Sequence, residues 1–155
     1  MQGTLICAIT DGAENNDAVA QATTISERLG LRLVLAHVVD GIAPLGNGGE
    51  ESITMKGDRV AAERRLAELA REHGIDASAE RRVAVGDPAT LIGRIASEEA
   101  ADVILVGARP RGWRRRGHES KLARELETET PVPVLVAPPR ARRAGERATP
   151  IGGRR

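Results

Sequence analysis

A regular alternation of short apolar runs with longer segments of helical period is the feature that most constrains the fold of this chain. Five runs are predicted as strands: residues 4–9, 31–38, 77–85, 101–107 and 131–137. Between them, apolar residues recur every three to four positions, as in amphipathic helices, in residues 16–29, 58–73, 88–96 and 120–127. Most of the runs are continuous in Val, Leu, Ile and Ala, which is typical of parallel strands buried on both faces. The alternation, without a hairpin signal, predicts an α/β fold with a three-layer, doubly wound, five-stranded parallel sheet.

The third and fifth predicted strands have the chemistry of sheet edges. Glu80, Arg81 and Arg82 place charge on the third strand, and charge discourages an edge strand from pairing with another chain. The fifth strand contains Pro131 and Pro133, which lack the backbone N–H of other residues. Residues two apart in a strand face the same side, so both missing donors are expected at the outer edge. The rest of that strand is apolar and uncharged, so we expect it to pair with another strand.

A glycine- and arginine-rich segment, residues 108–119, separates the fourth strand from the last helix. Free N–H groups and the positive end of a helix dipole converge at such a helix start, which suits an anion. The segment carries five guanidinium groups, those of Arg109, Arg111, Arg114, Arg115 and Arg116. They form either an anion clamp, since guanidinium groups bind phosphate bidentately, or a solvated charged loop. Ser120, directly after the segment, is a candidate for contact with the anion or for the N-cap of the last helix.

The ends of the first, fourth and fifth strands resemble those of the universal stress protein family. In its nucleotide-binding members the fourth strand is followed by a glycine, two residues, a glycine, nine residues and Gly-Ser or Gly-Thr. These members close with Pro-x-Pro-Val-x-Val. Gly107 matches the first glycine, and residues 131–136 match the closing strand. Pro110 stands at the second glycine, Ser120 at the third and Lys121 at the hydroxyl position, so the chain departs from the pattern in its phosphate loop.

This resemblance, which spans residues 3–138, implies the strand order 3-2-1-4-5 of adenine nucleotide α-hydrolase-like proteins. It implies a crevice for ATP where the order reverses, between the first and fourth strands, with Mg²⁺ bound only together with ATP. The residues expected to contact the nucleotide are Asp11, Val38, Gly107, Arg109, Ser120 and Lys121. Asp11 is expected against the adenosine, or else it forms an Asx-type turn before Gly12. Val38 is expected to meet the base through its backbone, or else it belongs to the ordinary core.

Pro110 and Lys121 indicate that the triphosphate pocket is altered. Pro110 fixes a backbone angle and adds bulk where a phosphate needs close approach, whereas Lys121 adds a charge that compensates in part. The resemblance further implies a two-fold homodimer through the last strand, from Val132 to Ala137.

The C-terminal end differs in composition from the rest of the chain. We expect residues 1–138 to form the α/β domain and residues 139–155 to form a basic, disordered tail. The tail combines Arg140, Arg142, Arg143, Arg147, Arg154 and Arg155 with Glu146. Its charge is therefore +5, and because the whole chain carries +1, residues 1–137 carry −4.

Composition argues against several classes of function. Trp113 is the only aromatic residue, which counts against modules that stack nucleic-acid bases on aromatic platforms. Cys7 is the only cysteine, so no internal disulfide forms, and the three histidines lack a metal-ligand spacing. No apolar stretch has the length of a membrane span or the form of a signal peptide, so we expect a cytoplasmic protein.

No catalytic triad, pair of carboxylates or metal set is visible in the sequence. We therefore expect a regulatory binding module of the stress response rather than an enzyme, with slow ATP hydrolysis left open because some relatives imply it. The alternative is an anion or nucleic-acid binder acting through the arginine-rich segment and the tail, whose affinity would fall steeply with salt. Nucleic acid is the less expected partner. A third hypothesis is an enzyme of the wider α-hydrolase-like group, for which the sequence names no substrate.

Overall fold

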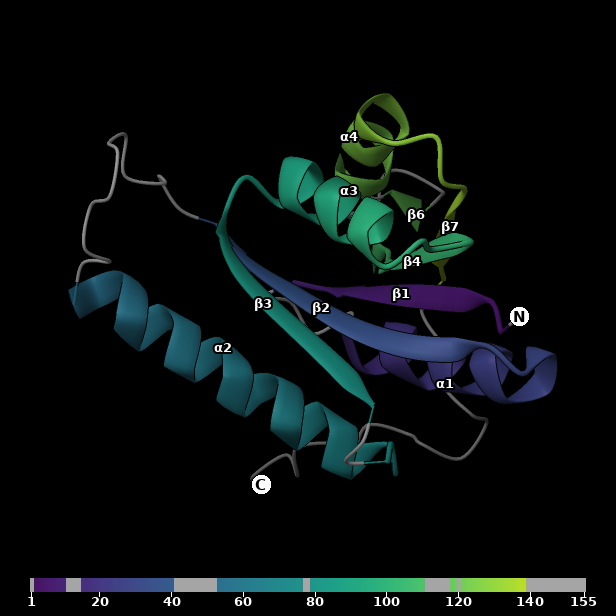
Figure 1. Ribbon diagram of the computed structural model, residues 1–155, viewed down its shortest axis with the longest axis horizontal. Helices are drawn as coiled ribbons and strands as arrows, with labels where there is room; N and C mark the ends of the chain where they lie inside the picture. Colours follow the sequence, from purple (N-terminus) through teal and green to yellow (C-terminus); the bar gives the residue numbers. More distant parts are fainter. Residues whose placement is uncertain are drawn as a thin grey trace, which may run out of the picture.

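The computed structural model describes residues 2–10, 15–40, 53–76, 79–110, 118–119 and 121–138. Figure 1 shows strands and helices in alternation along these ranges. The strands are β1 (Thr4–Ile9), β2 (Arg32–Asp40), β3 (Glu80–Gly86), β4 (Val103–Gly107), β5 (Arg109–Pro110), β6 (His118–Glu119) and β7 (Val134–Ala137). The helices are α1 (Asn15–Leu29), α2 (Ile53–Glu72), α3 (Pro88–Glu98) and α4 (Lys121–Glu129). Among the described helices, none combines the length and the hydropathy needed to cross a membrane.

Five of the strands form one parallel sheet in the order β3-β2-β1-β4-β7. Since β7 is the last strand of this sheet along the chain, the predicted order 3-2-1-4-5 is confirmed. At the centre of the sheet, Ile6 of β1 lies opposite Val34 of β2 and Ile104 of β4. The order reverses between β1 and β4. The charged third strand, β3, and the last strand, β7, are the two edges, as their sequences predict.

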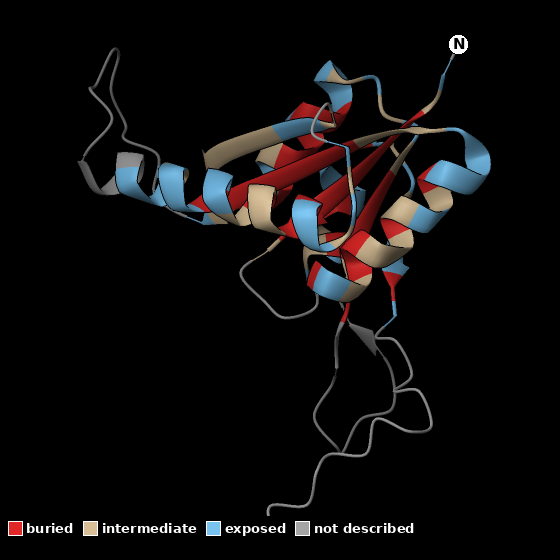
Figure 2. Cartoon of the chain, turned by 90° about the horizontal axis from the view of Figure 1, so that it is seen from below, coloured by how far each residue is buried: buried red, intermediate tan, exposed pale blue. Residues whose placement is uncertain are grey.

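Helices cover both faces of the sheet, α3 and α4 on one face and α1 and α2 on the other (Figure 1). Successive residues of β1 point to opposite faces, so that Ile6 packs under α3 and α4 while Leu5 and Cys7 pack against α1 and α2. Figure 2 shows buried strands between helices whose outer sides are exposed. Burial raises the pKa of the Cys7 thiol to about 12, so this residue is an inert, neutral part of the core.

The start of α3 is the one predicted from Gly86-Asp87-Pro88. Asp87 is the N-cap, its Oδ2 accepting from the backbone N–H of Thr90 at 3.0 Å, and Pro88 is the first helical residue. The hydrogen bonds from Thr90 hold the pKa of Asp87 below its ordinary value. Gly86 has a φ of 149°, and a Cβ there would lie 2.9 Å from Leu91 Cδ1, so this position requires glycine.

Two segments differ from the prediction. Helix α2 begins at Ile53 instead of residue 58, so that Gly57 lies inside the helix. Glycine lowers helix propensity, but a single glycine does not end a helix. Within the predicted loop of residues 108–119, Arg109 pairs with Glu119 and Pro110 with His118 as a small antiparallel sheet, β5-β6. The sequence carries no signal for this pair. Strands of two residues are too short to produce an alternating pattern in the sequence.

The predicted direction of Pro133 is also wrong. The backbone N–H of Ile104 in β4 donates to Pro133 O at 2.9 Å, and that of Ala108 donates to Ala137 O at 3.1 Å. The backbone of Pro133 therefore faces β4 rather than the outer edge. Pro133 is tolerated there because it precedes the first residue of β7, where a missing ladder donor costs little. By the same alternation, the backbone polar groups of Val134 and Val136 face the free edge.

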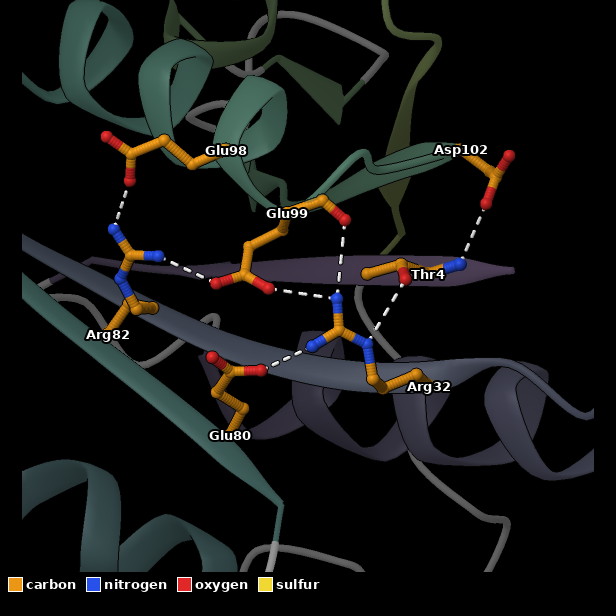
Figure 3. A network of polar contacts seen from close by, with 7 residues as sticks. All are labelled: Thr4, Arg32, Glu80, Arg82, Glu98, Glu99 and Asp102. Carbon is orange, nitrogen blue, oxygen red and sulfur yellow. Dashed lines mark hydrogen bonds and ion pairs between the residues drawn. The ribbon is translucent and has the colours of Figure 1, made fainter. Parts of the chain in front are cut away.

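Charged side chains tie the amino ends of the strands together (Figure 3). Glu99, at the end of α3, accepts from Arg32 Nη2 at 2.9 Å and from Arg82 Nη1 at 2.7 Å. Arg32 also pairs with Glu80, and Arg82 with Glu98. Burial alone would raise the pKa of Glu99, but the hydrogen bonds from the two arginines outweigh it and hold that pKa below its ordinary value. We call these five side chains the charge network.

Candidate functional site

The candidate site lies at the carboxyl end of the sheet, where β1, β2 and β4 end side by side. Ile9, the last residue of β1, lies opposite His37 of β2, and Ala8 lies opposite Val106 of β4. Helices α1 and α4 begin beyond this edge, after β1 and β4 respectively. In doubly wound parallel sheets, ligands bind outside the carboxyl ends of the strands, next to the point where the strand order reverses. In the described fold, a ligand is therefore expected at the carboxyl ends of these strands.

Thr10 and Asn15 close the connection between β1 and α1. Asn15 Oδ1 accepts from the backbone N–H of Thr10 at 2.9 Å, and Asn15 Nδ2 donates to the carbonyl oxygen of Thr10. The Asn15 side chain is nearly inaccessible, with a relative exposure of 2%. A single buried amide therefore satisfies both backbone groups of Thr10 and fixes the distance between the end of β1 and the first turn of α1.

A cavity of about 410 Å³ opens beside this connection. Its walls come from the end of β1, the first residue of α1, the end of β2 and the middle of α2: Thr10, Asn15, His37, Val39, Asp58, Ala61, Ala62 and Arg65. Small-molecule sites typically measure about 300–1,000 Å³ and combine apolar walls with a few placed polar groups. The size and lining of this cavity fall within that description.

The polar groups of the cavity come from different elements. Thr10 and Asn15 supply hydroxyl and amide groups at the sheet, and the buried His37 supplies an imidazole from β2. Across from them, α2 supplies Asp58 and Arg65, the latter with its Nη1 3.8 Å from Glu68 Oε2. Within the described ranges, no group of three or more His, Cys, Asp or Glu side chains is placed to hold a metal ion. The cavity suits a small organic ligand with hydroxyl or ring nitrogen groups.

Sequence reasoning did not select these lining residues. An Asn directly before an apolar-periodic segment is a helix-start signal that could have identified Asn15. His37 interrupts an otherwise apolar run, and that interruption is the signal in the sequence that could have identified it. Asp58 and Arg65 belong to a helix face rich in charge, and nothing in the sequence distinguishes them from their neighbours.

Two of the predicted contacts lie at the ends of strands. Val38 is in β2, between His37 and Val39, and its side chain is buried in the core beneath α3 and α4. Gly107 is the last residue of β4, lies opposite Ala137 of β7 and is half-buried. Their strands, β2 and β4, flank β1 on either side. The structure therefore brings both residues to the carboxyl end of the sheet.

Of the other predicted contacts, Asp11 follows β1, and Arg109, Ser120 and Lys121 lie between the end of β4 and the start of α4. The backbone of Arg109 is in β5, opposite Glu119. Lys121 is the first residue of α4, and its exposed ammonium lies 3.5 Å from Glu125 Oε1 of the same helix. Asp11 and Ser120 lie outside the described residues, as do the remaining arginines of the segment. Lys121 therefore has a carboxylate partner one helical turn away on the same helix.

Comparisons with known proteins agree on one family. The sequence profile of the universal stress protein family matches residues 1–138. A search of curated protein sequences finds no match. Among solved structures, universal stress protein UspA from Lactobacillus plantarum is similar at 15% identity and a TM-score of 0.63, with 88% of this chain and 99% of that chain covered.

Two further similar structures contain a nucleotide. A universal stress protein in complex with cAMP is 18% identical, with a TM-score of 0.61 and coverage of 86% of this chain and 95% of that chain. The universal stress protein from Archaeoglobus fulgidus in complex with dAMP is 16% identical, with a TM-score of 0.57 and coverage of 86% and 96%. At these identities, the likeness to solved structures establishes the fold.

Proposed function

The chain belongs to the universal stress protein family, and from that premise we propose that it is a regulatory module of the stress response that binds an adenine nucleotide. The proposed site is the cavity at the carboxyl ends of β1 and β2, beside the point where the strand order reverses between β1 and β4. ATP is the candidate nucleotide, with Mg²⁺ entering only together with ATP. The proposal assigns no catalytic residue, so binding rather than turnover is the function.

The observation that carries this proposal is the cavity beside Thr10 and Asn15. Its volume of about 410 Å³ is adequate for a small ligand such as a nucleoside. Val39 and Ala62 offer apolar contact to a base, while Thr10 and Asn15 offer hydroxyl and amide groups. Val38 lies between two residues of the lining, in keeping with the hypothesis that its backbone meets the base. The complexes of two similar proteins with cAMP and dAMP give further support.

The phosphate end of the site is proposed to be altered. Residue 110 takes part in the β5-β6 pair. Because it is a proline, it has no backbone N–H to donate to a phosphate oxygen. Lys121 has an exposed ammonium paired with Glu125 on the helix surface. We therefore expect the β- and γ-phosphates of ATP to add little affinity beyond that of AMP.

Calorimetric titration tests this proposal. ATP with Mg²⁺ and AMP are each titrated into the protein at low and high salt, and we expect saturable, weakly salt-dependent binding of similar strength for both. Ala61→Trp, which fills the cavity from α2, is expected to weaken binding by roughly tenfold or more, equivalent to about 1.4 kcal/mol. Val60→Trp is the matched control, because Val60 is the preceding residue of α2 and is 51% exposed.

If neither ATP nor AMP produced a heat of binding, the nucleotide proposal would be overturned. Binding that falls steeply with salt and is unchanged by Ala61→Trp would favour the alternative, an anion or nucleic-acid binder acting through the arginine-rich segment and the tail.

A two-fold homodimer through β7 is part of the proposal. Leu135 and Val136 are large apolar side chains with 46% and 38% exposure, and the backbone groups of Val134 and Val136 face the free edge. An apolar edge strand with unpaired backbone groups favours pairing with a second copy. We expect a mass in solution of twice 16.4 kDa at micromolar concentration.

Charge on this edge is expected to separate the dimer. Val136→Lys places an ammonium at the interface and should give a monomer in analytical ultracentrifugation. Leu29→Lys is the control, since Leu29 is a 68% exposed apolar residue at the end of α1. A monomeric unmodified protein would contradict the dimer.

A further inference from the structure

The chain leaves the sheet against one flank of α1. After β7, Ala137 is buried in the core cluster on the α1 and α2 face of the sheet. Gln21 Nε2 of α1 then donates to the carbonyl oxygen of Pro138 at 2.8 Å. Residues 139–155 therefore start from a fixed point beside the middle of α1.

A hollow of about 500 Å³ lies farther along α1, at the amino end of the sheet. It is bounded by the last turns of α1, the first residues of β2 and the connection from α2 to β3. Leu31, Leu33 and Ile75 give it an apolar floor and are each partly exposed. This hollow is distinct from the cavity at the carboxyl ends of the strands, with which it shares no lining residue.

The rim of this hollow is acidic. Its lining contains the carboxylates of Glu27, Asp76 and Glu80 against the single guanidinium of Arg32. Arg32 directs its donors to Thr4, Glu80 and Glu99, so the charges of Arg32 and Glu80 are both engaged within the charge network, and the acidity of the rim comes from Glu27 and Asp76. An occupant with apolar stems and several positive charges would complement both the floor and the rim.

The tail of this chain has that chemistry. Residues 139–155 contain six arginines and one glutamate. Seventeen residues reach about 56 Å when extended, whereas Gln21 and Glu27 are about 9 Å apart along a helix axis. Arginine stems pack on apolar surface while their guanidinium groups form charge-assisted hydrogen bonds to carboxylates.

We propose that the C-terminal tail, residues 139–155, docks within its own subunit into the hollow between α1, β2 and the α2–β3 connection. Docking there neutralises part of the −4 charge of residues 1–137 and covers the apolar floor. It also holds the tail at the opposite end of the sheet from the candidate nucleotide cavity. The docked tail is therefore independent of whether a nucleotide binds.

A spin label on the tail of the full-length protein tests this proposal. Ala144→Cys provides the attachment point, and Cys7 stays unlabelled because it is buried with a raised pKa. We expect loss of most of the amide NMR signal of Leu31 and Ile75 at the hollow, with no loss at Val106 in β4. The loss should disappear at about 1 M salt, where the screening length falls to about 3 Å.

Two charge reversals separate specific docking from general attraction. Glu27→Arg changes the rim and should restore the amide signals of Leu31 and Ile75. Glu127→Arg reverses an exposed glutamate of α4, on the other face of the sheet, and should leave the signal loss unchanged. Signal loss spread over the surface, centred on another face, or insensitive to Glu27→Arg would overturn the proposal.

A mixed sample decides whether the contact lies within one subunit. Isotope-labelled protein without the spin label is combined with unlabelled protein that carries it. The proposal predicts no signal loss at the hollow in this mixture. Loss there would mean that the tail binds the hollow of another subunit, which contradicts docking within the same chain.

Discussion

At the amino ends of β1, β2 and β3 the sheet is held by charged side chains that bond one another (Figure 3). At the carboxyl ends, in contrast, β1 and β2 border an open cavity. The amino end joins α3, β2 and β3 through Glu99, which has two guanidinium partners. Thr4 of β1 joins them through Arg32 Nε at 3.3 Å, and its own N–H donates to Asp102 Oδ2 at 2.8 Å.

At the carboxyl end, the described residues line a cavity. There, the Asn15 amide holds Thr10, and the walls of the cavity come from four separate elements. The two ends of the sheet therefore have different roles. Contacts at the amino end fix the positions of the strands, which leaves the carboxyl end free to vary its side chains for a ligand.

The largest expected effect comes from removing the centre of the charge network. Glu99→Ala leaves Arg32 and Arg82 without their shared, 10% exposed partner, so we expect the free energy of unfolding to fall by about 2–3 kcal/mol. Chemical denaturation measures this. Glu98→Ala is the control: Glu98 has a 47% exposed side chain and pairs with Arg82, so its loss should cost under about 1 kcal/mol. Equal costs for both variants would show that the network does not centre on Glu99.

Acid should also remove the contribution of Glu99 to the stability of the protein. The pKa of Glu99 is lower in the folded protein than its reference value of 4.5, so its contribution is fully present above that value. As the pH falls through the lowered pKa, Glu99 is protonated and the contribution is lost. We expect the free energy of unfolding to fall more steeply in acid for the unmodified protein than for Glu99→Gln. Parallel curves for the two proteins would contradict this assignment.

At the carboxyl end, Asn15 is the residue whose loss should cost most. Asn15→Ala removes the partner of both backbone groups of Thr10 in a site of 2% exposure, which we expect to cost about 1–2 kcal/mol of stability. Because Asn15 also lines the cavity, nucleotide affinity should fall with it. Asn16→Ala, at the exposed next position, should change neither quantity measurably. A variant as stable as the unmodified protein would show that the loop holds its shape without this amide.

Features that depend on neighbouring residues could be predicted from the sequence, whereas features that join distant residues could not. The alternation of strands and helices, the buried Cys7 and the Asp87 cap follow from local patterns, because apolar periodicity and turn chemistry act over a few residues. The strand order was implied only by the resemblance to the universal stress protein family. The charge network and the cavity depend on residues far apart in the chain, such as Arg32 and Glu99, and no local pattern pairs them. The direction of Pro133 was wrong because alternation gives two possible sides, and only the register with β4 decides between them.

The smallest effect is expected from Lys121, at the phosphate end of the proposed site. Its ammonium is 85% exposed and 3.5 Å from Glu125 Oε1, one turn along α4, an arrangement that contributes about 0.3–0.5 kcal/mol. Lys121→Ala should therefore change the free energy of unfolding by less than about 0.5 kcal/mol. It should also leave the affinities for ATP and AMP unchanged in calorimetry, because the lysine is engaged on the helix surface. Glu125→Ala releases the ammonium and is the informative partner variant. If Lys121→Ala weakened ATP binding but not AMP binding, the lysine would reach the outer phosphates, and the phosphate end would be compensated rather than lost.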